Sequence, residues 1–165
     1  ADEFVDSDAA KLASEINAVS ADHLMFASDE NLKRMADAGV TSVILPGTTF
    51  FLGKKTYVDA NKILKFGGDI AIASDYNPGS CFIQSMPFIM FLSNLYCNLS
   101  IDLSFKACTY SAAKVLKKEK QIGLVKEGYK ADLLVWDLDN LAAIPYSFDR
   151  QESILNIIKN GKVIK

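Results

Sequence analysis

Apolar and polar residues along the first half of the chain follow two patterns in turn. The continuous apolar run at residues 70–73 predicts a strand covered on both faces, residues 41–45 predict another buried strand, and residues 19–24 predict a short strand or strand end. Beside these segments, apolar residues recur at helical spacing and predict helices at residues 9–16, 28–39 and 57–66. Residues 48–52, rich in threonine and phenylalanine, are predicted to form a loop. Strands and helices that alternate at such short intervals predict right-handed βαβ units and a parallel sheet.

The pattern changes after residue 85. Two apolar stretches predict consecutive helices, at residues 86–98 and 103–116. Further on, residues 131–137 predict a strand, and residues 153–165 predict a hairpin because Asn160-Gly161 favours a type I′ turn. We therefore predict two regions, an α/β region at residues 1–120 and a separate small β layer at residues 121–165.

Composition and charge narrow the class of protein. The chain has 165 residues, half of them hydrophobic, which is enough for one domain with a sizeable core. A net charge of −2 gives no support for binding nucleic acid or an anionic membrane. The apolar runs are too short to span a bilayer, and the acidic N-terminus lacks the apolar core of a signal peptide. Three cysteines without CxxC spacing fit a reducing cytoplasm.

Two candidate chemical groups follow predicted strands. Asp75 lies two residues after the predicted strand at residues 70–73, and His23, the single histidine, lies near the end of the strand-like segment at residues 19–24. Catalytic groups of parallel α/β barrels lie at the carboxyl ends of the strands, which favours both residues. Each also has a structural interpretation, since Asp75 could cap a helix and His23 could be a surface residue. Likewise, Asn77-Pro78-Gly79-Ser80 has the composition of an ordinary turn.

Five short motifs are distinctive: Ala1-Asp2-Glu3-Phe4, Ser20-Ala21-Asp22-His23-Leu24, Leu45-Pro46-Gly47-Thr48, Ser74-Asp75-Tyr76-Asn77-Pro78-Gly79-Ser80 and Ser85-Met86-Pro87. Together they resemble the imidazolonepropionase family of the metal-dependent amidohydrolases. The tail, with Lys130 to Asp137 and Asn160 to Ile164, resembles amidohydrolases in general. The resemblance covers the whole chain but only the C-terminal portion of the family's length. It implies that residues 1–120 form strands 6–8 and the following helices of a (β/α)8 barrel, and that residues 121–165 form strands of a small β-sandwich.

The resemblance also implies a cofactor. Family members hold one zinc or iron ion with three histidines and an aspartate, and the aspartate corresponds to Asp75. A bound divalent metal makes hydroxide available from water near neutral pH. The three histidines lie outside this chain, one of them directly before Ala1, and residue 1 is not methionine. We therefore expect a fragment that is inactive on its own.

The implied reaction is hydrolysis of the ring amide of 4-imidazolone-5-propanoate to N-formimidoyl-L-glutamate. In it, Asp75 ligates the metal and carries the proton of water to the leaving nitrogen. His23 stabilises the oxyanion or aids proton transfer, and Glu3 contacts the imidazolone ring. The substrate carboxylate is expected to contact Asn77, Gly79 and Ser80.

The resemblance also implies binding partners: a cytoplasmic homodimer that acts on a small molecule and binds neither nucleic acid nor membrane. A second hypothesis is another cyclic amidohydrolase or a nucleobase deaminase, which would share the barrel and the tail. A third is a non-enzymatic half-barrel that assembles with itself or a partner, because such a unit leaves open sheet edges and exposed apolar surface.

Overall fold

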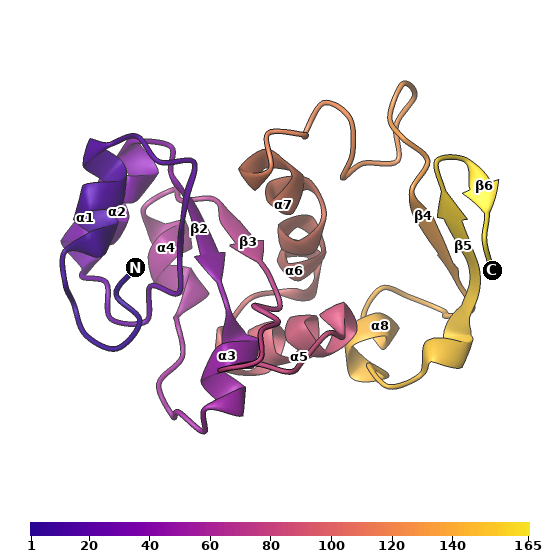
Figure 1. The fold of residues 1–165 in the computed structure, drawn as a ribbon, viewed down its shortest axis with the longest axis horizontal. Coiled ribbons are helices and arrows are strands. Elements are labelled where there is room, and N and C mark those ends of the chain that lie inside the picture. Colours follow the sequence, from indigo (N-terminus) through magenta and orange to yellow (C-terminus); the bar gives the residue numbers. More distant parts are fainter.

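The parallel sheet forms at the three segments that the sequence predicts to be strands. The structure is a computed structural model that describes residues 1–165 apart from the side chain of Gln151. Strands β1 (Ser20–Asp22), β2 (Thr41–Ile44) and β3 (Ile70–Ile72) are parallel, in the spatial order β1-β2-β3 (Figure 1). All residues of β2 and β3 are buried, as expected for strands that are covered on both faces. The predicted strands are therefore confirmed, each somewhat shorter than its apolar run.

The three predicted helices form beside the strands. Helix α1 (Ala9–Glu15) precedes β1, α2 (Asp29–Asp37) connects β1 to β2, and α4 (Ala60–Lys65) lies between β2 and β3. The hydroxyl of Ser28 caps α2 by accepting a hydrogen bond from the Asn31 amide at 3.3 Å. The next helix, α5 (Met86–Tyr96), begins after the capping residue Ser85. One continuous core joins these helices to the sheet, and its fully buried members include Ala10, Ile44, Ala60 and Ile89.

The predicted loop at residues 48–52 is wrong, because a short helix, α3 (Pro46–Phe51), occupies most of it. Pro46 stands at the start of this helix, where its fixed φ suits the first turn and its missing N–H is not needed. Thr48 and Thr49 are buried, so tertiary packing overrides their weak helix propensity.

The single helix predicted at residues 103–116 is also wrong. The chain forms α6 (Ile101–Cys108) and α7 (Tyr110–Val115), which both pack on β3. Thr109 breaks the helix with a φ of −119° and a ψ of −86°. Gly123 packs against this break, and a Cβ there would lie 2.9 Å from the Thr109 carbonyl oxygen. The break therefore reflects a contact with a distant segment.

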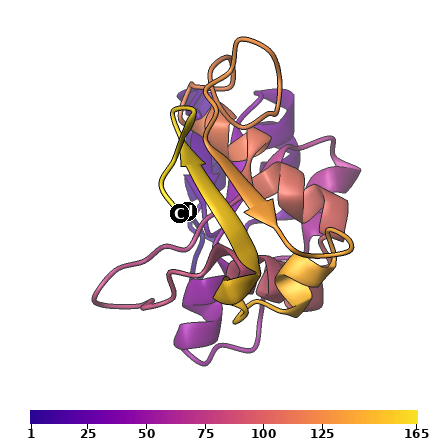
Figure 2. The same cartoon turned by 90° about the vertical axis from the view of Figure 1, so that its right-hand side faces the viewer.

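A second sheet contains the C-terminal strands. Strands β4 (Leu133–Trp136), β5 (Ile154–Lys159) and β6 (Lys162–Val163) form an antiparallel sheet in that order (Figure 2). The β5–β6 turn has a φ of 50° at Asn160 and 76° at Gly161, as a type I′ turn requires. The predicted strand and hairpin are therefore confirmed.

Two short elements, α8 (Ala143–Tyr146) and the 3-10 helix Gln151–Ser153, separate β4 from β5. Helix α8 packs on α5, and the ring centroid of Phe148 lies 4.7 Å from that of Phe88 and 5.2 Å from that of Phe91. This aromatic contact joins the C-terminal region to the first region. Among the described residues, no helix is both long enough and apolar enough to cross a membrane.

Candidate active site at the carboxyl edge of the parallel sheet

His23 lies directly beyond the end of β1. Its backbone amide donates to the Val43 carbonyl oxygen at 3.0 Å, which continues the pairing with β2. The backbone then turns sharply, with a φ of 72° at His23 and 66° at Leu24. The imidazole Nδ1 lies 3.7 Å from Glu3 Oε1, and the two side chains are 19% and 24% exposed. The histidine and the glutamate therefore face each other as an ion pair whenever the imidazole is protonated.

The first three residues run beside the end of β1. The terminal amino group of Ala1 donates to the Asp22 carbonyl oxygen at 2.9 Å, and the Leu24 amide donates to the Ala1 carbonyl oxygen at 2.9 Å. These two bonds place Glu3 next to His23.

Asp2 holds this segment to α1. Its buried carboxylate accepts four hydrogen bonds, from the Ser7 amide and hydroxyl and from the amides of Ala9 and Ala10. Burial opposes ionisation of this carboxyl group, but the hydrogen bonds outweigh it, and the pKa of Asp2 is lowered. Asp2 was not predicted from the sequence, and its role in the structure is to order the loop that precedes α1.

Asp75 lies at the same edge, beyond the end of β3. Its φ is 51°, a left-handed conformation that is uncommon outside glycine. The hydroxyl of Thr48 donates to Asp75 Oδ2 at 2.6 Å. The carboxylate is half-buried, so one oxygen is held by the protein and the group remains accessible.

Asn77 organises the turn that follows Asp75. Its Oδ1 accepts from the amides of Gly79 and Ser80, both at 2.8 Å. Its Nδ2 donates to the Asp75 carbonyl oxygen at 2.7 Å and to Ser80 Oγ at 3.0 Å. Asn77, Gly79 and Ser80 are thus brought together, but their polar groups bind one another in this conformation.

The two candidate groups stand on either side of the end of β2. With β2 between β1 and β3, the segments of His23 and Asp75 are two strand spacings apart, about 10 Å. His23, Leu24 and Asp75 all have a positive φ at this edge, a conformation that other parts of the chain also adopt, for example at Asn98 and Lys117.

The described part of the chain does not bring together the ligands of a complete metal site. Among the described residues, no group of three or more histidine, cysteine or acidic side chains is placed to bind one. Asp75 offers a single carboxylate, whereas zinc sites have three or four protein ligands. Thiolate chemistry at Cys97 and Cys108 is also disfavoured, because burial raises the pKa of Cys97 to about 12 and that of Cys108 to about 11.

Comparison with known proteins shows to which protein family this chain belongs. The model of the amidohydrolase family matches residues 4–164, and the chain belongs to this family. It is 43% identical to the imidazolonepropionase of Kosmotoga olearia over 164 residues, which cover 99% of this chain and 40% of that protein. It is 40% identical to the imidazolonepropionase of Alkaliphilus oremlandii, with 99% and 39% covered. The chain therefore spans about two fifths of the length of these curated relatives and corresponds to their C-terminal portion.

A solved structure supports the same fold. An adenosine deaminase from Xanthomonas campestris with bound zinc superposes with a TM-score of 0.74 at 19% identity. The superposition covers 87% of this chain and 36% of that protein. The α/β amidohydrolase fold and the family resemblance read from the sequence are thus confirmed.

Proposed function

We propose that this chain is part of an enzyme that hydrolyses the ring amide of 4-imidazolone-5-propanoate to N-formimidoyl-L-glutamate in histidine degradation. The observation that carries the proposal is 43% identity to an imidazolonepropionase along nearly the whole chain. It is supported by Asp75 and the His23–Glu3 pair, which lie at the carboxyl edge of the parallel sheet.

In the proposed reaction, Asp75 accepts a proton from the attacking water and delivers it to the leaving ring nitrogen. A half-buried carboxylate with one oxygen held by Thr48 suits this role, because the other oxygen is left to carry the proton. His23 stabilises the developing oxyanion or moves a proton, and Glu3 both orients the imidazole and contacts the ring of the substrate.

The turn after Asp75 is the proposed site for the propanoate carboxylate. Ser80 offers a hydroxyl and Asn77 an amide, and Gly79 is exposed on the segment between β3 and α5 that projects from the body (Figure 2). The bonds within this turn would be exchanged for bonds to the carboxylate.

The remaining parts of the proposal concern architecture and cofactor. Residues 1–120 are proposed as strands 6–8 and the following helices of a (β/α)8 barrel, and residues 121–165 as strands of a small β-sandwich. One divalent ion, zinc or iron, is proposed to bind Asp75 as its one ligand from this chain. Its other ligands are proposed to come from residues outside this chain. A cytoplasmic homodimer without nucleic-acid or membrane partners is proposed from the resemblance alone.

A chimaeric enzyme tests the function. The region of the Kosmotoga olearia imidazolonepropionase that precedes the match is joined to residues 1–165 of this chain, and zinc or iron is supplied. We expect formation of N-formimidoyl-L-glutamate, no turnover by the isolated chain, and a loss of at least about 100-fold for Asp75→Asn. Asp37→Asn changes an exposed carboxylate far along α2 and is the matched control.

Each result of this assay has a definite meaning. Deamination of adenosine or guanine by the folded chimaera, without turnover of the imidazolone, would favour the nucleobase-deaminase hypothesis. A folded chimaera that turns over none of these substrates would refute the proposed enzyme. Strong self-association of the isolated chain in light scattering would then favour the half-barrel that assembles with a partner.

A further inference from the structure

The start of helix α3 contacts both candidate segments of the site. Thr48, which is only 2% exposed, donates its hydroxyl to Asp75 Oδ2 at 2.6 Å. The next residue, Thr49, donates its hydroxyl to the sulfur of Met25 at 3.1 Å, two residues beyond His23. One turn of helix after β2 therefore touches the segments that follow β1 and β3.

Close packing fixes this turn in place. A Cβ on Gly47 would lie 2.6 Å from Ile89 Cδ1, 3.2 Å from Cys81 Sγ and 3.4 Å from the Ser74 carbonyl oxygen. The absence of a side chain at Gly47 thus lets the helix approach the backbone directly before Asp75. Cys81, which follows the Asn77 turn, lies with its Sγ 3.2 Å from the same Ser74 carbonyl oxygen. The end of that turn therefore also packs against the start of α3.

We propose that Thr48 is a positioning residue that fixes the orientation of the Asp75 carboxylate. The hydroxyl engages Oδ2 and leaves Oδ1, to which no described residue donates a hydrogen bond, as the oxygen available to the reaction. The direction of the carboxylate is thereby set by a buried hydroxyl in α3, the helix that follows the neighbouring strand β2. This inference rests on the proposed function, because it assigns Asp75 to the chemistry.

Two substitutions in the chimaera separate the hydroxyl from the shape of the side chain. Thr48→Val keeps the volume and removes the donor, whereas Thr48→Ser keeps the donor. We expect Thr48→Val to lower kcat by about 30-fold with KM within about 3-fold, because a misdirected reacting group slows turnover more than it weakens binding. Thr48→Ser should retain at least about a third of kcat. Thr41→Val makes the same change at a buried threonine at the opposite end of β2 and should leave kcat unchanged.

Crystal structures of the chimaera and its Thr48→Val variant provide a readout besides activity. We expect a single orientation of the Asp75 side chain when residue 48 is threonine. In the Thr48→Val variant we expect a rotated side chain or two alternative conformers. The inference is overturned if the orientation is unchanged, or if Thr48→Val and Thr48→Ser reduce kcat alike. A chimaera without activity would refute the proposed function, and the two structures would still decide the role of Thr48.

Discussion

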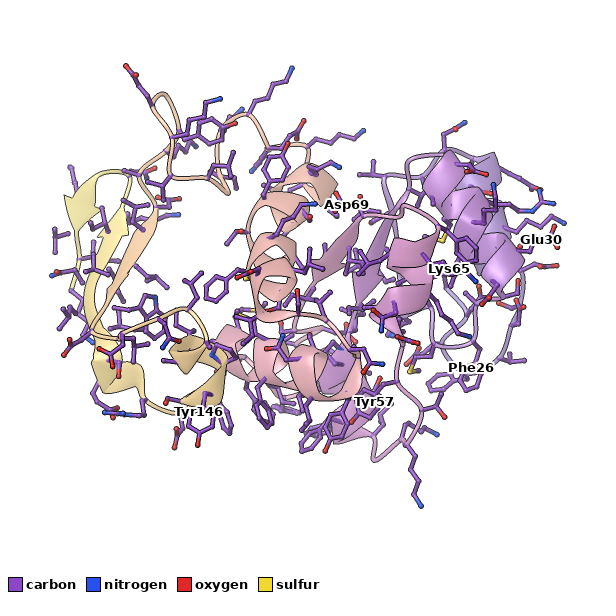
Figure 3. All side chains as sticks on the ribbon, turned by 180° about the vertical axis from the view of Figure 1, so that it is seen from behind. Phe26, Glu30, Tyr57, Lys65, Asp69 and Tyr146 are labelled. Carbon is purple, nitrogen blue, oxygen red and sulfur yellow. The ribbon has the colours of Figure 1, made fainter. Side chains whose placement is uncertain are left out.

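Asp69 is the residue for which the structure gives the clearest stability prediction. It directly precedes β3, at the amino end of the parallel strands, whereas the candidate site lies beyond their carboxyl ends. Figure 3 labels its side chain in the upper part of the view. Its carboxylate accepts four hydrogen bonds, from Lys114 Nζ at 2.7 Å, Ser111 Oγ at 3.0 Å, the Ile70 amide at 3.1 Å and Lys106 Nζ at 3.2 Å. This group ties α6 and α7 to the sheet.

We expect Asp69→Asn to lower the free energy of unfolding by about 2 kcal/mol. Hydrogen bonds to a charged group contribute about 1.5–3 kcal/mol when shielded from water. The lysines, however, are 41% and 50% exposed, and solvent screening reduces such pairs to about 1 kcal/mol or less each. Asparagine keeps one acceptor oxygen, so part of the network survives.

The effect should depend on pH in a definite direction. Burial opposes ionisation of Asp69, but the hydrogen bonds from Lys114, Ser111 and Lys106 outweigh it, and the pKa of Asp69 is lowered. A carboxyl group with a lowered pKa stabilises the fold above its unfolded pKa of about 3.9 and loses this contribution as the pH falls through the folded value. The difference in the free energy of unfolding between the unchanged chain and Asp69→Asn should therefore be at its maximum at pH 7 and should shrink below about pH 4.

Urea unfolding followed by circular dichroism measures this difference. Asp37→Asn is the control, because Asp37 is 62% exposed and its pair with Lys33 should contribute less than about 0.5 kcal/mol. A loss below about 0.5 kcal/mol for Asp69→Asn at pH 7, or a loss that grows on acidification, would refute the reasoning.

Two further substitutions test the carboxyl edge. Gly47→Ala should destabilise the protein by about 1–3 kcal/mol in the same unfolding assay, because the new methyl group meets Ile89 and Cys81; an unchanged midpoint would contradict the packing. Asn77→Ala removes the acceptor of the Gly79 and Ser80 amides, so hydrogen exchange of these two amides should accelerate while the rest of the chain is unaffected; unchanged protection would show that the turn does not depend on Asn77.

Local patterns explain the elements that the sequence predicts well. The strands β1 to β3 follow from continuous apolar runs, and the β5–β6 hairpin follows from Asn160-Gly161, whose two positive φ values are a property of those residues. The break at Thr109 is different, because it accompanies the packing of Gly123, fourteen residues away. Helix α3 likewise depends on the burial of Thr48 and Thr49, which a local pattern does not contain.

In the candidate site, too, some features follow from the local sequence and others only from the fold. The positions of His23 and Asp75 at the carboxyl edge follow from the strand pattern alone. Their neighbours do not, because Glu3 meets His23 and Thr48 meets Asp75 across 20 and 27 residues of sequence. The motif Leu45-Pro46-Gly47-Thr48 marks the family resemblance, but only the fold shows what the threonine touches.

Three aspartates near the ends of the sheet show how the structure separates a supporting carboxylate from a reactive one. Asp2 and Asp69 each accept four hydrogen bonds, and both have a lowered pKa. The side chain of Asp75 accepts one bond from the described residues, although it is half-buried. A half-buried carboxylate that is left with unused acceptor capacity contributes little to the fold. That contrast favours Asp75 as the carboxylate kept for chemistry, and Asp2 and Asp69 as the carboxylates that hold the fold around it.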